Sequence, residues 1–573
     1  MHNEDIADTF LDIADLLEIK GEQPFRINSY RRAARTLKDL TRDVAELADA
    51  GELGKLPGIG KSTAAKIEEF LADGSIRFHT ALFESIPAGL PPLLEIPGLG
   101  PKRIALVWKE LGVENLADLK ETIADGRFAE LKGMGAKSVE QISHGIRFAE
   151  QSAGRTPLGL AWPLAVELAA AMQDVKAVRR VEVTGSIRRG CETIGDVDLL
   201  CESSRGDAVV KAFTELHQVK RILASGKTKG SVIVDRRDGV EIQVDCRAVP
   251  SESFGAALQY FTGSKEHNVH LREIASKKKW KLNEWGLYSG ERRLAGKDEA
   301  AVYKKLGMPF IPPQQREDRG EFEPDAIQPL IELGDIRGDL HLHTTASDGT
   351  ADAETMARAA HELGYEYIAV TDHSKSSTIA NGLSIDKMWR HIEKLRKLNE
   401  QLDTVTILAG CECDILAGGE LDYPDQLLAA CDFVVASIHS GMRQERKKAT
   451  ARVLRAIENP HVTMLGHPTG RLLSRREPMD LDMATVIDKA AETHTALELN
   501  AAWQRLDLND RHLRMAIDAG AMIGIATDAH SIIQFNQMKF GILTARRGWV
   551  RANNVLNTMQ LPALRQWIAQ KRG

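Results

Sequence analysis

The stretch that decides the fold is Gly185-Ser186-Ile187-Arg188-Arg189-Gly190-Cys191-Glu192-Thr193-Ile194-Gly195-Asp196-Val197-Asp198. Residues 181–183 before it are typical of a short strand that enters a Gly-Ser turn, and residues 196–200 of a second strand. Because side chains alternate along a strand, Asp196 and Asp198 share one face. Two close carboxylates suit Mg²⁺, which prefers oxygen ligands and is often completed by substrate phosphates. The stretch therefore predicts nucleotidyl transfer.

Length and composition set the wider limits. A chain of 573 residues is too long for one core and predicts roughly three or four domains. There is no apolar run long enough to cross a membrane, and the acidic N-terminus does not resemble a signal peptide. The six cysteines form no CxxC pair, which fits a reducing cytosol. We expect a cytoplasmic, nucleoid-associated protein that makes no membrane contact and is a monomer.

The net charge of −6 hides an uneven distribution of charge. Residues 1–150 sum to −6, residues 151–320 to +6 and the remainder to −6. The basic middle segment contains the Gly-Ser stretch, as a polyanionic substrate would favour. Eleven of the 17 histidines lie at or beyond His341, so the C-terminal segment is expected to have a different chemistry.

The first 150 residues show a helical pattern that is broken three times by a similar glycine pair. The pairs are Gly58 and Gly60, Gly98 and Gly100, and Gly133 and Gly135, and a helical pattern with an early lysine follows each of them. Glycines let the backbone bend, and the free N–H groups at the next helix start can hold a DNA phosphate. Three copies predict a helix-hairpin-helix region that binds DNA.

Residues 155–310 have a mixed strand and helix pattern. Residues 312–334 are rich in proline, glutamine and charge and are predicted to be a linker. From residue 335 on, apolar strands alternate with helices, as in an α/β barrel.

Strands in this C-terminal segment repeatedly end in side chains that can bind a metal. The nine candidates are His341, His343, Asp348, His373, Glu412, His439, His467, Asp528 and His530. Side chains at successive strand ends converge at the C-terminal mouth of a barrel. Nine ligands exceed the needs of one ion, so we expect two or three Mn²⁺, Zn²⁺ or Fe ions and hydrolysis of phosphate esters. Asp372 is expected to orient a ligand imidazole. Five other histidines lack this placement and are expected to be ordinary residues, namely His361, His391, His461, His494 and His512.

These motifs resemble a known family. Residues 1–310 resemble X-family DNA polymerases of the DNA polymerase beta type, and residues 335–573 resemble the polymerase-and-histidinol-phosphatase (PHP) domain. The resemblance implies a multidomain fold with a helical N-terminal region, an α+β nucleotidyltransferase palm and thumb, and a distorted TIM-like PHP barrel. The expected parts are a lyase-like domain (1–85), a second helix-hairpin-helix subdomain (86–155), the palm (156–255), a nucleotide-pocket subdomain (256–311), the linker (312–334) and the PHP domain (335–573).

The same resemblance assigns the polymerase residues. Asp245 joins Asp196 and Asp198 as the third metal carboxylate, for Mg²⁺ or Mn²⁺, and is the expected helper for the primer hydroxyl proton. The residues expected to contact the incoming deoxynucleoside triphosphate and the template are Gly185, Ser186, Arg189, Tyr260, Phe261, Gly263, Lys265, Asn268 and Arg272.

Residues 1–85 are similar to the family's lyase domain. Lys66 falls where the Schiff-base lysine sits, and a lysine amine can attack the aldehyde of an abasic site. Arg26 and Ser62 depart from the pattern, because the animal enzyme has phosphate-binding lysines there.

The resemblance as a whole implies a repair polymerase that fills short gaps in gapped or nicked DNA. Since all nine PHP ligand positions are intact, it also implies a 3′→5′ exonuclease, and a 3′-end phosphatase or abasic-site endonuclease is compatible with the same cluster. Two other hypotheses stay open. One is a template-independent nucleotidyltransferase with a small-molecule phosphoesterase domain, and the other is a DNA-end scaffold with little or no catalysis.

Overall fold

The structure is a computed structural model that describes residues 2–38, 40, 43–96, 98–152, 154–235 and 240–572. It falls into two compact units. The first is residues 1–153 with Ser474–Glu477, and the second is residues 154–473 with 478–573. Among the described residues, no helix is long and apolar enough to span a membrane.

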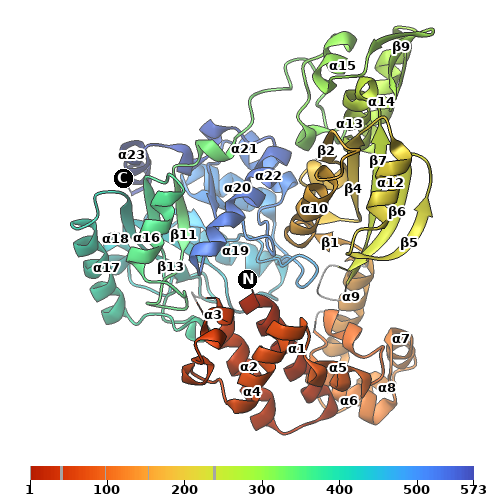
Figure 1. Ribbon diagram of the computed structural model, residues 1–573. Helices are drawn as coiled ribbons and strands as arrows, with labels where there is room; N and C mark the ends of the chain where they lie inside the picture. Colours follow the sequence, from red (N-terminus) through yellow and green to blue (C-terminus); the bar gives the residue numbers. More distant parts are fainter. Residues whose placement is uncertain are drawn as a thin grey trace. The chain divides into compact units, whose positions relative to one another are not determined.

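The first unit is helical and packs around its own apolar core. Its helices are α1 (His2–Lys20), α2 (Pro24–Lys38), α3 (Val44–Asp49), α4 (Lys61–Asp73), α5 (Arg77–Glu84), α6 (Pro101–Leu111), α7 (Leu116–Ala124), α8 (Arg127–Glu130) and α9 (Ala136–Ser152), shown in red to orange in Figure 1. All three glycine pairs precede a helix, namely α4, α6 and α9. The second unit holds all the described strands.

The palm is a five-stranded sheet with the order β2-β4-β7-β6-β5. The strands are β2 (Arg180–Val183), β4 (Asp196–Glu202), β5 (Val219–Ser225), β6 (Lys229–Asp235) and β7 (Glu241–Val249). Helices α10 (Leu158–Gln173) and α12 (Gly206–Thr214) pack on one face (Figure 1). β4 runs parallel to β7, with Asp198 opposite Asp245.

The expected Gly-Ser turn is instead one turn of helix, α11 (Gly185–Arg188). The N–H of Arg189 donates to the carbonyl of Gly185 at 3.2 Å, which closes that turn. Gly185 has φ +63, and a Cβ there would lie 2.3 Å from Oδ2 of Asp198. Glycine is therefore required both for the backbone conformation and for the approach of the carboxylate.

The region after the palm contains two helices, a small sheet and a third helix. They are α13 (Phe254–Thr262), α14 (Lys265–Lys277), β8 (Lys281–Asn283), β9 (Gly286–Ser289), β10 (Arg292–Ala295) and α15 (Glu299–Leu306). The predicted linker that follows is mostly irregular but is anchored to other parts of the second unit. Arg316 is fully buried, and its guanidinium lies 2.5 Å from Glu299 and donates to the carbonyl of Ile311.

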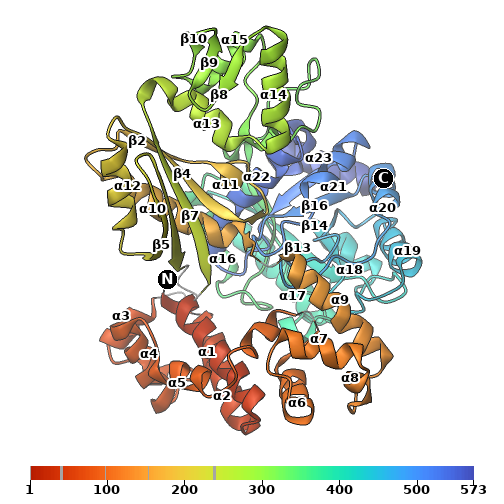
Figure 2. The same ribbon diagram turned by 90° about the vertical axis from the view of Figure 1, so that its right-hand side faces the viewer.

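The C-terminal half is a parallel sheet of seven strands in sequence order. The strands are β11 (Gly338–Leu342), β12 (Tyr367–Val370), β13 (Thr406–Asp414), β14 (Phe433–Ser437), β15 (Met464–Leu465), β16 (Ala496–Asn500) and β17 (Ile523–Ala526). A parallel bridge between Leu342 and Ala529 brings the two ends together, so the barrel is nearly closed. Figure 2 shows helices α18 (Asp425–Ala430) to α21 (Asp510–Asp518) outside the strands. The expected TIM-like barrel is confirmed.

The palm and the barrel share part of one apolar core. Leu506 and Phe540 of the barrel belong to the cluster that fills the palm. The rings of Trp162 and Phe540 meet edge to face at 6.3 Å. A Cβ on Gly159 would lie 2.2 Å from the Trp503 ring. Side chains of the palm and the barrel thus pack directly against one another.

Candidate functional site

Three candidate metal carboxylates lie on adjacent strands of the palm. Asp196 and Asp198 project from β4, and Asp245 projects from β7 in register with Asp198. Burial and then the neighbouring carboxylates raise the pKa of Asp198 to about 7. Burial and then Asp245 also raise the pKa of Asp196. Carboxylates that repel each other in this way provide a binding site for divalent cations.

Asp245 differs from its two neighbours because it has a cation of its own. Burial raises its pKa, but hydrogen bonds from Lys229 and Gln243 outweigh that effect and lower it overall. Lys229 Nζ lies 2.5 Å from Asp245 Oδ2. Lys229 was not predicted from the sequence, because it is the antiparallel pairing of β6 with β7 that brings it near Asp245.

Arg189, expected to hold the triphosphate, already has a carboxylate partner. Its Nε donates to Glu317 Oε1 at 2.8 Å, and its Nη1 donates to the carbonyl of Thr262. The same Glu317 oxygen accepts from Arg547 of the barrel at 2.8 Å. The Glu317 carboxylate therefore binds the Arg189 guanidinium in the way that a phosphate group would.

The other expected pocket residues lie around the junction of α13 and α14. Tyr260 and Phe261 meet edge to face at 5.1 Å. Asn268 donates to the carbonyls of Tyr260 and Gly263 and so fixes this junction. Lys265, Asn268 and Arg272 stand at i, i+3 and i+7 on α14 and thus share one face, and Lys265 and Arg272 are exposed.

The three glycine pairs have one backbone geometry. Gly58, Gly98 and Gly133 have φ of +76, +90 and +86, in the region that favours glycine. The second glycines, Gly60, Gly100 and Gly135, directly precede helices, and a Cβ on any of them would meet no atom of the described residues within 4 Å. Space beside the backbone at this point is what a phosphate bound at a helix N-terminus would need. Pro97, in the second hairpin, lies outside the described residues.

Lys66 lies on α4 in an aromatic setting. Its Nζ is 3.0 Å from Ser62 Oγ and 5.2 Å from the centre of the Phe78 ring. Burial, with a smaller contribution from Arg26, lowers the pKa of Lys66. A lowered pKa increases the fraction of free amine, which is the nucleophilic form.

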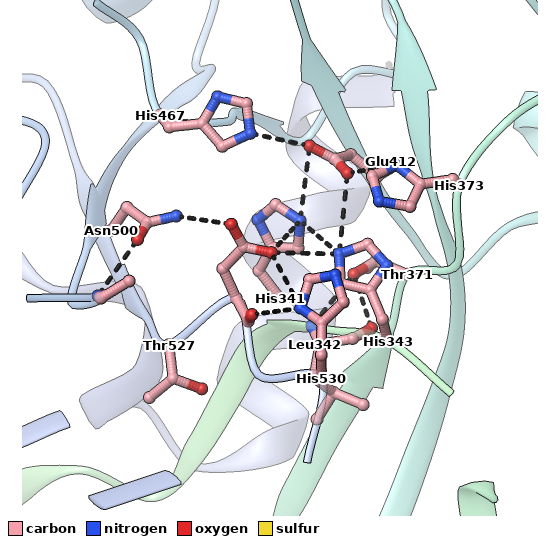
Figure 3. Close-up of polar contacts among 12 residues, drawn as sticks. His341, Leu342, His343, Thr371, His373, Glu412, His467, Asn500, Thr527 and His530 are labelled. Carbon is pink, nitrogen blue, oxygen red and sulfur yellow. Dashed lines mark hydrogen bonds and ion pairs between the residues drawn. The ribbon is translucent and has the colours of Figure 1, made fainter. Parts of the chain in front are cut away.

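The nine expected ligands of the barrel come together at the carboxyl ends of its strands. Figure 3 shows the Glu412 carboxylate among the imidazoles of His341, His343, His373 and His467. Glu412 oxygens lie 2.8 Å from His373 Nδ1, 2.9 Å from His467 Nε2 and 3.2 Å from His439 Nε2. Asp528 Oδ1 lies 3.1 Å from His343 Nε2, and Asp348 Oδ2 lies 3.4 Å from His530 Nε2.

The cluster contains three groups of candidate ligands. Within each group, the ligand atoms lie within 4.8 Å of one another. The groups are His343 with Asp348, His373 and His530; His341 with His343 and Asp528; and His373 with Glu412 and His439. His467 joins them through Glu412. His467 and Asp528 adopt positive φ of 25 and 54, a strained conformation that is typical of functional sites.

The donor atoms fit metal ions better than they fit one another. His373 Nδ1 and Glu412 Oε2 are buried and lie 2.8 Å apart, yet they lack hydrogen-bond geometry. Burial, then the charges of His373 and His530, lower the pKa of His343 to about 4. Burial likewise lowers the pKa of His467 to about 3. Both imidazoles are neutral near pH 7, which is the form that binds a metal.

Two carboxylates that were not predicted from the sequence lie against candidate ligands. Glu498 is fully buried, and its Oε1 lies 2.7 Å from His341 Nδ1. Asp414 Oδ1 lies 2.7 Å from His439 Nδ1. Both lie on barrel strands, and the only available signal was an acidic residue inside an otherwise apolar strand. Such outer carboxylates fix the ring orientation of a ligand histidine.

The expected role of Asp372 is wrong. Its carboxylate accepts from Thr344 and Ser347, in the loop that leads to Asp348, so it fixes a loop rather than a ligand imidazole. The reason is that the chain after β12 turns this buried side chain toward the loop. His391, which belongs to none of the groups of candidate ligands, pairs with this carboxylate, since its Nε2 lies 2.9 Å from Asp372 Oδ2.

Four protein-family models match parts of the chain. Residues 1–76 match the helix-hairpin-helix domain and residues 90–147 the SAM-like helix-hairpin-helix tandem. Residues 257–317 match the DNA polymerase beta thumb and residues 339–502 the PHP domain. The thumb match extends into the predicted linker, and Asp528 and His530 lie beyond the PHP match.

Three relatives cover different parts of the chain. It is 39% identical over 566 residues to the DNA polymerase/3′-5′ exonuclease PolX of Bacillus subtilis (strain 168), which covers 98% of each chain. A DNA nucleotidylexotransferase of Ambystoma mexicanum is 27% identical over 358 residues, 53% of this chain and 67% of the relative. A probable phosphatase of Thermoanaerobacter sp. (strain X514) is 26% identical over 245 residues, 41% of this chain and 95% of the relative.

The fold and its two carboxylate-rich sites define a nucleotidyltransferase joined to a PHP-type barrel. The full-length similarity to PolX makes the assignment specific. The chain belongs to the X-family DNA polymerases that carry a C-terminal PHP domain.

Proposed function

We propose that this protein is a DNA-directed DNA polymerase that fills short gaps during DNA repair and that its PHP barrel is a 3′→5′ exonuclease. One observation carries the proposal. A chain that is similar to PolX over its whole length has the three palm carboxylates on adjacent strands, and eight of the nine candidate ligands of the barrel fall into close groups, with His467 in contact with Glu412. Its substrates would be gapped or nicked DNA and deoxynucleoside triphosphates, and it would act as a monomer in the cytoplasm, associated with the nucleoid.

The palm residues divide the work of polymerisation. Asp196, Asp198 and Asp245 would hold Mg²⁺ or Mn²⁺, which when bound supplies the Lewis acidity for the primer hydroxyl and the departing pyrophosphate. Asp245 would accept the hydroxyl proton. Arg189 would leave Glu317 and bind the triphosphate.

The remaining pocket residues would place the nucleotide and the template. Gly185 and Ser186 would face the triphosphate, and Tyr260, Phe261 and Gly263 would lie against the sugar. Lys265 and Asn268 would lie near the base, and Arg272 would reach the template.

The barrel residues would bind and orient the 3′ end. Two or three Mn²⁺, Zn²⁺ or Fe ions would be held by the nine ligands and would supply the activated water for phosphodiester hydrolysis. Glu498 and Asp414 would keep His341 and His439 in the orientation that binding requires.

The helical unit would grip DNA phosphates with its three hairpins, and Lys66 would act on abasic sites as a lyase. The lowered pKa of Lys66 supports this assignment. Capture of Lys66 by borohydride on abasic DNA, absent in Lys66→Ala, would test it.

Two variants test the main proposal on gapped duplex DNA with Mg²⁺ or Mn²⁺. Asp198→Ala should abolish extension and leave 3′ degradation, and His343→Ala should do the reverse. Asp174→Ala on the palm and His361→Ala on the barrel serve as controls, because both residues are exposed. Loss of both activities in either variant would refute the assignment of separate sites.

The unmodified protein tests the two other hypotheses. Extension of a single strand without a template would favour the nucleotidylexotransferase type of activity suggested by the second relative. A protein that binds DNA but neither extends nor degrades it would be a scaffold.

A further inference from the structure

Arg505 is a cation at the edge of the barrel cluster that the functional assignment leaves unexplained. It lies in the loop after β16, and its Nε is 3.6 Å from Oδ2 of Asp528. Its side chain is 19% exposed, and its Nη1 is buried with no hydrogen-bond partner among the described residues. Its charge also contributes to the low pKa of His467, after burial.

The guanidinium therefore pairs with Asp528 through Nε but has a buried Nη1 donor that could bind a further anion. A buried donor without an acceptor is unfavourable, and such groups are rare unless a ligand or water completes them. Asp528 is expected to bind a metal ion, so the local field becomes more positive when the site is loaded. The forked guanidinium matches the oxygens of a phosphate.

The backbone of Arg505 is held from the polymerase side. Arg471 donates from its Nε to the carbonyl of Arg505 at 3.0 Å and from its Nη2 to the carbonyl of Leu506. Arg471 in turn donates to both carboxylate oxygens of Glu192, at 3.2 and 2.7 Å. Glu192 belongs to the palm, just after α11, so a palm residue braces a residue beside the barrel cluster.

We propose that Arg505 binds a phosphate oxygen of the 3′-terminal nucleotide in the PHP site, and that Glu192 holds it in position through Arg471. The inference rests on the proposed nuclease function. It adds a substrate-binding residue to that site and makes its geometry depend on the palm.

The test compares Arg505→Ala, Arg505→Lys and Glu192→Ala with the unmodified protein, and Arg565→Ala on the exposed face of α23 (Leu561–Arg572) serves as the matched control. The nuclease assay uses an unpaired 3′ strand with Mn²⁺. Arg505→Ala should lower kcat/KM about ten- to a hundredfold, mainly through KM, since a charge-assisted hydrogen bond is lost. Arg505→Lys should recover part of the loss. Glu192→Ala should raise KM about threefold, because Arg505 remains but is less well placed.

Two further measurements separate substrate binding from a structural role. The bound metal, measured by elemental analysis, should stay at the unmodified level in Arg505→Ala. Titration calorimetry of the loaded protein with inorganic phosphate should show affinity about tenfold weaker in Arg505→Ala than in Arg565→Ala. Primer extension should be unchanged in Arg505→Ala.

Each other result overturns the inference. Unchanged nuclease kinetics and phosphate affinity would show that Arg505 binds no phosphate. Loss of metal together with activity would make it a brace for Asp528. An unmodified protein without nuclease activity would refute the proposed function itself and the inference with it, whereas an active protein with an indifferent Arg505 would refute the inference alone.

Discussion

Removal of the Glu498 charge should weaken metal binding at the barrel and leave the polymerase untouched. Glu498 Oε1 pairs with His341 Nδ1 at 2.7 Å, and Oε2 accepts from the backbone N–H of His467. The carboxylate thus orients two of the nine ligands from one fully buried position.

The structure sets the expected magnitude. In Glu498→Gln, the carbonyl oxygen can accept from only one of these two N–H groups, and the new NH₂ group faces the other donor. Loss of such an outer partner typically lowers metal affinity or activity by about 10–100-fold, so we expect the Mn²⁺ midpoint of the nuclease to rise by that factor. Glu498→Ala leaves both donors buried without an acceptor. Each unsatisfied donor lowers the free energy of unfolding by about 1–3 kcal/mol, so this variant should also be less stable.

The assay is Mn²⁺ titration of 3′ degradation, with primer extension measured on the same preparation. Glu492→Gln is the matched control, because Glu492 is exposed at the end of the helix that precedes β16. A Glu498→Gln protein that is folded and has an unchanged Mn²⁺ midpoint would refute the reasoning.

Two further predictions concern the other sites. Glu317→Gln should lower the KM for the incoming nucleotide several-fold, because Arg189 is released from its carboxylate partner; steady-state single-nucleotide insertion measures this, and an unchanged KM would contradict it. Although burial opposes the effect, Arg547 and Arg189 hold the pKa of Glu317 at about 2, so the stability from this pairing is present above its ordinary pKa of 4.5 and is lost only as the pH falls toward 2. In the helical unit, Arg26→Ala should raise the pKa of Lys66 and shift borohydride trapping on abasic DNA to higher pH, since a like charge is removed. If the pH profile of trapping were the same in Arg26→Ala as in the unmodified protein, Arg26 would have no influence on the pKa of the Lys66 amine.

The ligand positions could be predicted from the sequence because local rules fix them. Alternation along a strand places Asp196 and Asp198 on one face, and strand ends of a parallel barrel converge. The turns at the glycine pairs could be predicted for the same reason, since only glycine readily takes the φ that Gly58 requires.

Contacts between distant segments could not be predicted. Glu498 lies within a strand that otherwise resembles an ordinary core strand, and its pairing with His341 joins residues 157 positions apart. Proline, glutamine and charge predicted a linker over residues 312–334, but Arg316 and Glu317 pair with residues elsewhere in the second unit. Composition shows that a charge is present, but only the tertiary fold shows whether it is solvated or paired.

The apolar core that the palm shares with the barrel also has a consequence for synthesis of the chain. Trp162 leaves the ribosome long before Phe540, on the order of 20–80 s earlier at a synthesis rate of about 5–20 residues per second. During that interval the apolar face of the palm is not covered by the barrel. This exposed face can associate with other nascent chains or with chaperones. The half that builds DNA therefore completes its fold only when the half that trims DNA has nearly been made.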